Sequence, residues 1–247
     1  VSDGSDSGRS SSTGAGGRGG VQLSGERRGI DPDDSKSRTP SEDSIRSFGS
    51  SLARFHRAST DANGRFVENA NVRRFIESVE LTKSASKFGA AVDSVSPEKL
   101  AGSDIFMLDD NLGGAVVSRE GDLFGVFKHP DSKEDMKELL VELGRNHPKL
   151  LTLDAYDVKG FLPNLYYRTM GFAPLARVPF NREYAPEGFP YDIMGEPDVV
   201  LMARTENPPM MVDYNTVRPN VAVFSDWDDG IAHREKRMET LGTPVQL

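Results

Sequence analysis

The chain has 247 residues, with 38 acidic and 30 Lys or Arg side chains, which give a formal net charge of −8 at pH 7. This charge argues against a nucleic-acid-binding protein, which would carry a basic surface, and the absence of cysteine excludes disulfides, thiolate nucleophiles and cysteine-ligated zinc. No apolar run approaches the roughly 18–20 residues that span a bilayer, and no secretory signal pattern opens the chain, so we expect neither a membrane partner nor signal-dependent secretion.

Residues 1–65 form the first predicted segment, and their composition indicates a disordered tail. They are rich in serine, glycine, aspartate and arginine, and include the run SSSTGAGGRGG. Such a segment buries too little apolar surface to offset the conformational entropy that ordering costs. Its composition is typical of a flexible linker and also of a partner-binding tail.

Two helices are predicted next, with a short strand over residues 88–95 between them. The second helix starts after Ser96, because Pro97 then occupies the first helical position. The first helix is predicted from an apolar face at helical spacing: Val72, Phe75, Ile76 and Val79.

Three strands follow, at residues 104–110, 114–120 and 122–128, separated by asparagine and glycine. Short strands with such turns predict an antiparallel meander. Pro130 ends the third strand, because proline has no N–H to donate to a ladder.

Helices and strands alternate in the second half of the chain. A helix is predicted from a cap at Asp131 or Ser132 to Gly144, and a short one over residues 164–169, ending at Gly171. Three more strands are predicted at residues 149–157, 172–180 and 197–204.

The sequence therefore predicts an α/β domain over residues 66–205, with a mixed, mostly antiparallel sheet flanked by helices. An extension over residues 206–247 contains a further helix, capped by Ser225 or Asp226.

The string YRTMGF, from Tyr167 to Phe172, resembles the C-terminal signature of the GNAT superfamily of N-acyltransferases. In that signature a tyrosine on a short helix is followed by a Gly-Phe pair that enters a strand. A longer stretch resembles GNAT-like modules inside large bacteriophage proteins, and the resemblance covers about residues 72–204. It is carried by these residues: Leu153, Asp154, Tyr156, Asp157, Leu162, Pro163, Tyr166 or Tyr167, Gly171, Phe172, Arg177, Phe180, Ala185 and Pro186.

The resemblance implies a GNAT-like fold and transfer of an acyl group from acetyl-CoA to an unknown amine. Tyr167 would be the acid that protonates the leaving thiolate, with Tyr166 as the alternative. Asp154 and Asp157, at a strand end, are the best placed carboxylates for the base that deprotonates the amine. Turn and cap formation is the alternative role for both carboxylates.

The same resemblance places acetyl-CoA along the third strand and the helix start that follows it. Backbone groups of Val126 and Phe127 would hold its carbonyl and pantetheine arm. GNAT enzymes hold the pyrophosphate in a glycine-containing loop, whereas residues 129–138 contain no glycine and their acidic side chains would repel a phosphate. The residues at the expected pyrophosphate position are Ser132, Lys133, Glu134 and Asp135.

A second hypothesis is a non-catalytic GNAT-fold module that serves as an interaction or structural part of a phage virion protein or polyprotein. The missing glycine loop and the long tail favour it, whereas the YRTMGF string favours the enzyme. Both hypotheses place the protein in the host cytoplasm or the virion, with virion proteins as possible partners. No pair of histidines has metal-ligand spacing, so no metal site is predicted.

Overall fold

A computed structural model describes residues 53–57, 59–60, 66–67, 70–205 and 213–241, with side chains from Ala70 onward. Most of the predicted tail therefore lies outside the described residues. The tail prediction is wrong for residues 53–57 and 59–60, which form strands, because residues 53–57 pair with a strand of the main sheet. All described residues belong to one compact unit, Ile45–Leu247.

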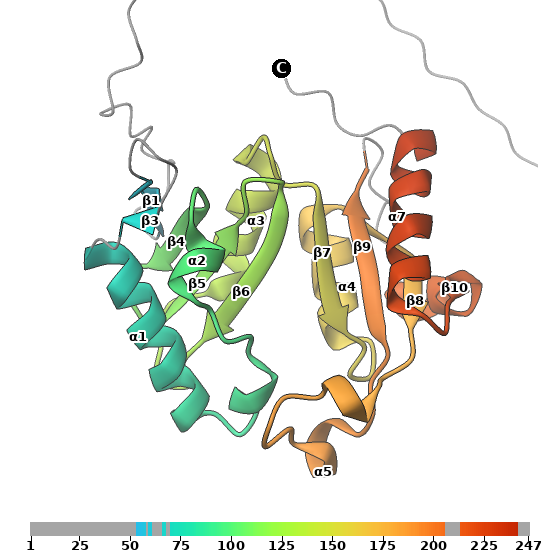
Figure 1. The fold of residues 1–247 in the computed structure, drawn as a ribbon, viewed down its shortest axis with the longest axis horizontal. Helices are drawn as coiled ribbons and strands as arrows, with labels where there is room; N and C mark the ends of the chain where they lie inside the picture. Colours follow the sequence, from blue (N-terminus) through green and yellow to red (C-terminus); the bar gives the residue numbers. More distant parts are fainter. Residues whose placement is uncertain (1–52, 58, 61–65, 68–69, 206–212, 242–247) are drawn as a thin grey trace, which may run out of the picture. The chain divides into compact units, whose positions relative to one another are not determined.

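The domain is built on one mixed sheet with the strand order β1–β4–β5–β6–β7–β9–β8–β10 (Figure 1). Neighbouring strands are antiparallel except in the β6–β7 and β8–β10 pairs, so the predicted mixed, mostly antiparallel sheet is confirmed. Strands β2 (Ser59–Thr60) and β3 (Phe66–Val67) form a separate pair. The strands of the main sheet are β1 (Ala53–Arg57), β4 (Asp104–Leu108), β5 (Gly113–Val117), β6 (Asp122–Lys128), β7 (Thr152–Tyr156), β8 (Phe172–Val178), β9 (Val199–Arg204) and β10 (Ala222–Val223).

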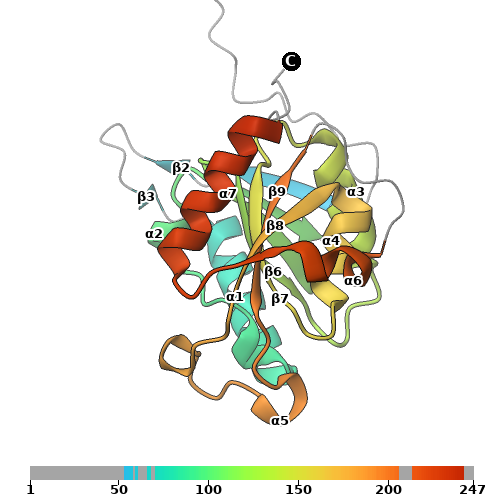
Figure 2. The same cartoon turned by 90° about the vertical axis from the view of Figure 1, so that its right-hand side faces the viewer.

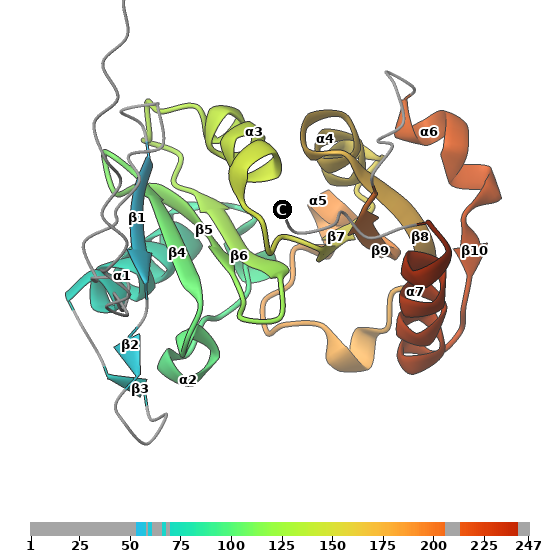
Figure 3. The ribbon, with the colours of Figure 1, turned by 90° about the horizontal axis from the view of Figure 1, so that it is seen from above.

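Helices cover both faces of the sheet, with α3 and α4 on one face and α1 and α7 on the other (Figures 2 and 3). No helix within the described residues combines the length and apolar character needed to cross a bilayer. The helices are α1 (Ala70–Ala85), α2 (Pro97–Leu100), α3 (Met136–Asn146), α4 (Phe161–Met170), α5 (Tyr191–Met194), α6 (Tyr214–Val217) and α7 (Trp227–Leu241). Three short 3-10 helices are η1 (Gly89–Ala91), η2 (Arg182–Tyr184) and η3 (Arg218–Asn220).

Alternating side chains divide the core between the two faces. Phe106 and Leu108 of β4 pack with α3 and α4, whereas Ile105 and Met107 pack with α1. Side chains of a strand alternate between faces, so β4 is apolar on both faces from Ile105 to Leu108. A third cluster joins α7 to β8 and β9 around Leu201.

The strand predicted over residues 88–95 is wrong. The chain here forms η1 and then an irregular connection to α2. A Cβ atom at Gly89 would lie 1.9 Å from the carbonyl oxygen of Lys83, so the chain turns back directly against α1. Val92 and Val95 pack on the α1 cluster, and this one-sided packing produces the apolar pattern that suggested a strand.

Helix α3 begins at Met136, later than the predicted cap at Asp131 or Ser132. Ser132 is held in a turn instead, because its N–H donates to the carbonyl of His129 and its Oγ donates to Asp110 at 2.7 Å. Asp135 is the N-cap, and its carboxylate accepts the N–H of Lys137 at 2.9 Å. Helix α4 ends at Gly171 in the left-handed conformation, as predicted.

The parallel strands β6 and β7 pair only at their beginnings, through Asp122 with Thr152 and Leu123 with Leu153. Gly125 lies beyond this point with a φ of 57°, where the β5–β6 register shifts by a bulge. A bulge bends a strand and increases its local twist. The two strands consequently diverge toward their C-terminal ends (Figure 1).

Gly121 lies where the two strands meet, and its carbonyl accepts the N–H groups of Leu151 and Thr152. Its φ is 96°, and a Cβ atom would lie 2.0 Å from the carbonyl oxygen of Lys149. Gly121→Ala is therefore expected to lower the free energy of unfolding by about 2 kcal/mol in urea denaturation.

Gly102→Ala is the matched control for this substitution. Gly102 has a φ of 75°, and the nearest atom to its added Cβ, Cδ of Arg119, lies at 3.8 Å, an ordinary contact, so only the backbone cost of about 1 kcal/mol remains. Equal losses for the two variants would contradict a steric requirement at Gly121.

Candidate functional site

A cavity of about 1790 Å³ lies over the diverging strands, and we call it the central cavity. Its walls come from β6 and β7, the connection after α1, the start of α4, the β8–β9 loop and α7. Arg234 of α7 lines it, and so does Tyr166 of α4, although these helices cover opposite faces of the sheet (Figures 2 and 3). The divergence of the strands thus lets groups from both helical layers reach one space.

Asp154 lies on the wall of the central cavity that faces α7. Leu153 and Ala155 on either side of it are buried against α3 and α4, so the alternation of β7 directs Asp154 to the opposite face. Arg234 Nη1 donates a hydrogen bond to Asp154 Oδ1 at 2.9 Å.

The surroundings of Asp154 raise the pKa of its carboxyl to about 6. The main cause is burial among protein atoms, which disfavours the charged form, and the carboxylates of Asp122 and Asp93 add to it, whereas Arg234 opposes it. About a third of the side chain remains exposed, because it opens into the cavity. A carboxylate with this pKa is ionised at pH 7 and can accept a proton.

Asp93 and Asp122 extend the negative charge of the central cavity. Burial raises the pKa of Asp93, while Lys99 and Lys83 counteract the rise. Asp122 accepts a hydrogen bond from the hydroxyl of Thr152. Among the described residues, no group of three His, Cys, Asp or Glu side chains is arranged to hold a metal ion.

The two adjacent tyrosines of α4 lie in different places. Tyr166 lines the central cavity, whereas Tyr167 lines a separate cavity of about 570 Å³ beside Val217 and Ala222. Successive helical residues point about 100° apart, which explains the separation. Burial raises the pKa of both hydroxyls, and Asp93 contributes further at Tyr166. The structure therefore brings Tyr166, and not Tyr167, to the cavity that Asp154 lines.

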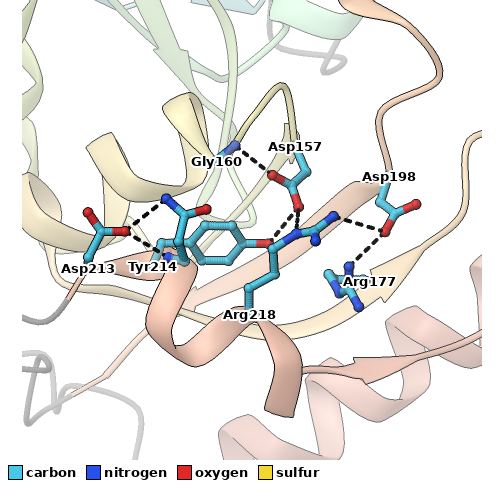
Figure 4. Close-up of polar contacts among 8 residues, drawn as sticks. Asp157, Gly160, Arg177, Asp198, Asp213, Tyr214 and Arg218 are labelled. Atoms are coloured by element: carbon cyan, nitrogen blue, oxygen red, sulfur yellow. Dashed lines mark hydrogen bonds and ion pairs between the residues drawn. The ribbon is translucent and has the colours of Figure 1, made fainter.

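Asp157 holds a turn and lies outside the central cavity. Its Oδ1 accepts the N–H of Gly160 at 2.9 Å, and its Oδ2 accepts bonds from the hydroxyl of Tyr214 at 3.0 Å and from Arg218 Nε at 2.5 Å (Figure 4). Its side chain is only 1% exposed. These contacts anchor α6 and η3 to the turn before α4, and they leave Asp157 without access to a ligand.

A second acidic residue continues this network. Asp198 accepts a bond from Arg177 Nη1 at 2.8 Å and lies 3.9 Å from Arg218 Nη2 (Figure 4). Arg218 therefore bridges two carboxylates. Burial, followed by the neighbouring Asp157, raises the pKa of Tyr214, so its hydroxyl keeps the proton that it donates.

The predicted contacts of β6 are divided between the cavity and the core. Val126 lines the central cavity, whereas the side chain of Phe127 is buried and meets Phe75 edge to face at 5.3 Å between ring centroids. After Leu123, β6 has no ladder partner on its β7 side within the described residues. Its backbone groups on that side are therefore available to a ligand.

The start of α3 carries a negative charge of its own. The carboxylate of Asp135 lies at the helix N-terminus, where a phosphate would bind. The N–H groups of Lys133, Glu134 and Asp135 form no hydrogen bonds with other described residues. This segment does not line the central cavity.

Asp122 and Arg234 were missed in the sequence analysis. The alternation of side chains along β6 could have placed Asp122 at the site. Leu123 faces the α3–α4 cluster, so its neighbour Asp122 must face the opposite side of the sheet, as Asp154 does. Arg234 lies in a charged helix 80 residues from Asp154, and no local pattern predicts that contact.

No protein-family model matches this chain, and neither curated proteins nor solved structures give a significant match.

Proposed function

We propose that the domain is a GNAT-like N-acetyltransferase that transfers an acyl group from acetyl-CoA to an amine. The observation that carries the proposal is the divergence of β6 and β7, with Asp154 and Tyr166 lining the cavity that results. A splayed strand pair of this kind is what the GNAT resemblance requires. The YRTMGF string and the order of helices and strands along the chain also support the proposal.

The chain's own residues would provide the proton transfers. Asp154, ionised above about pH 6, would accept a proton from the ammonium group of the acceptor. Tyr166 lines the same cavity, and its hydroxyl would protonate the leaving sulfur. Acetyl-CoA, when bound, supplies an acyl group activated as a thioester.

Residues on β6 and before α3 would hold the acetyl-CoA. The free β6 edge at Val126 and Phe127 fits the pantetheine arm. The N–H groups from Lys133 to Asp135, with the Lys133 side chain, would hold the phosphates in place of a glycine loop. The carboxylate of Asp135 opposes this contact.

Calorimetric titration of the full chain with acetyl-CoA tests the proposal. We expect binding with a dissociation constant on the order of micromolar, about −8 kcal/mol, and weaker binding after Lys133→Ala. No heat up to roughly millimolar ligand, about −4 kcal/mol, would reject the proposal.

The two tyrosines provide a matched pair of variants. Tyr166→Phe is expected to lower kcat by about 10²-fold, because it removes the acid that lines the cavity. Tyr167→Phe leaves the cavity unchanged and should keep activity close to the unmodified chain. Thiol release from acetyl-CoA, with free lysine, spermidine and a lysine peptide as acceptors, measures both. A larger loss in Tyr167→Phe would reverse the assignment.

A non-catalytic binding module is the second candidate function. Two observations favour it: Asp135 occupies the N-terminus of α3, and residues 129–138 lack glycine. A folded chain that binds no acetyl-CoA but does bind a partner in the central cavity would support this candidate.

A further inference from the structure

Exposed aromatic side chains gather around the central cavity. Phe88, Phe161, Tyr184 and Trp227 are all solvent-exposed, and all four line it. They come from four different elements: the connection after α1, α4, η2 and α7. Aromatic rings exposed together around a cavity are typical of a binding surface.

The loop that carries Tyr184 is held in place by ring contacts. Phe180 lies 4.9 Å from Phe189 and 6.3 Å from Tyr156 of β7, measured between ring centroids. Phe189 also meets Tyr191 at 5.0 Å. This side of the rim is therefore preformed before any ligand binds.

The charge of the central cavity selects a cation. Seven carboxylate side chains line it, against three cationic ones. The carboxylates of Asp93 and Asp122 help to raise the pKa of Asp154, and all three line the cavity, so they concentrate negative potential at the strand divergence. A ligand ammonium would be attracted both by this potential and by the faces of the exposed rings.

The size of the cavity favours an extended ligand over a small molecule. Its volume of about 1790 Å³ exceeds the roughly 300–1,000 Å³ of ordinary small-molecule sites. Arg234 lines the cavity, and its buried Nε has no acceptor among the described residues. A peptide carbonyl can accept that bond, whereas a polyamine offers no acceptor.

We propose that the central cavity binds an extended polypeptide segment whose lysine side chain reaches Asp154, with apolar neighbours of that lysine on the aromatic rim. As a statement about the acceptor, this inference rests on the proposed acyl transfer. The lysine nitrogen would form an amide with the acyl carbon while the carbon–sulfur bond breaks. One ammonium proton would pass to Asp154. The sulfur would leave with the bonding electron pair and take a proton from Tyr166, and the second nitrogen proton would restore the Tyr166 hydroxyl. Peptide binding itself does not depend on that reaction.

Trp227 gives a direct readout, because it is the only tryptophan in the sequence and is 42% exposed on the rim. The full chain is titrated, without acetyl-CoA, with a blocked nine-residue peptide that has one central lysine flanked by leucines. We expect a saturable change in tryptophan emission. A peptide with norleucine in place of lysine, and spermidine alone, should each bind at least about tenfold more weakly.

Variants of the exposed rings locate the contact. Phe161→Ala and Tyr184→Ala should each weaken peptide binding by about fivefold without changing Tm, because both side chains are more than two-thirds exposed. Leu81→Ala is the control, since Leu81 is an exposed apolar residue of α1 that does not line the cavity. It should leave binding unchanged.

Three results of the binding experiments would overturn the inference. Equal binding of the norleucine peptide would remove the role of the carboxylates, and equal binding of spermidine would reduce the site to a cation site. If Leu81→Ala weakens peptide binding as much as the ring variants do, the peptide does not bind at the aromatic rim. Peptide binding without acetylation would contradict only the acyl transfer, whereas acetyl-CoA binding without peptide binding would contradict only this inference.

Discussion

Asp157→Ala is expected to lower the free energy of unfolding by about 3 kcal/mol. The substitution leaves the buried hydroxyl of Tyr214 without its acceptor and removes one of the two carboxylates that Arg218 contacts. It also frees the N–H of Gly160 at the start of α4. Most of the loss comes from the buried Tyr214 hydroxyl and the Gly160 N–H, because an unpaired buried polar group costs more than a lost exposed contact. Urea denaturation followed by circular dichroism measures the change.

Two substitutions at neighbouring residues provide reference values for this loss of stability. Tyr214→Phe removes one hydrogen bond to Asp157 and should cost about 1 kcal/mol. Asp213→Ala removes the exposed cap of α6, where Asp213 accepts the N–H of Asn215 at 2.8 Å, and should also cost about 1 kcal/mol. If Asp157→Ala costs no more than Asp213→Ala, the network does not anchor the C-terminal elements.

Asp154→Asn, unlike Asp157→Ala, should abolish most of the activity and leave the free energy of unfolding unchanged. The amide oxygen can still accept the bond from Arg234, but it cannot take a proton. We expect kcat/KM for acyl transfer to fall by about 10²-fold. In the unmodified chain the rate should rise with pH and level off above about pH 6, because only the ionised carboxylate is active. The Asp154→Asn variant should show no such rise.

Two charge variants test the assignment of this pH dependence. Arg234 lowers the pKa of Asp154, so Arg234→Gln should move the midpoint to higher pH. Asp122 raises that pKa, so Asp122→Asn should move the midpoint to lower pH. A midpoint that does not move in either variant would exclude Asp154 as the titrating group.

The elements that follow from local pattern were predicted well from the sequence. The apolar run of β4 and the left-handed end at Gly171 depend on neighbours along the chain, and both are confirmed. The predicted strand at residues 88–95 is wrong because its apolar pattern comes from packing on α1. The start of α3 was displaced by the contact of Ser132 with Asp110, 22 residues away.

The candidate site was harder to predict, because it depends on contacts between distant segments. Asp154 and Asp157 flank the end of one strand and have the same chemistry in the sequence. Their surroundings differ because Arg234 reaches the first and Arg218 the second, across 80 and 61 residues. The choice between Tyr166 and Tyr167 depends on the rotation of α4 about its axis, which a ten-residue helix with apolar residues on several sides does not reveal.

The short contact between β6 and β7 leaves the sheet with little mechanical stiffness across its middle. Two residue pairs and the bonds to Gly121 join these strands, whereas β7 and β9 pair along the whole of β7. Bending about this contact is therefore the softest deformation of the sheet, and it changes the width of the central cavity without breaking other ladders. A ligand that contacts both β6 and β7 would restrict this bending. Hydrogen exchange at the Leu151 and Thr152 amides should therefore slow when the cavity is filled.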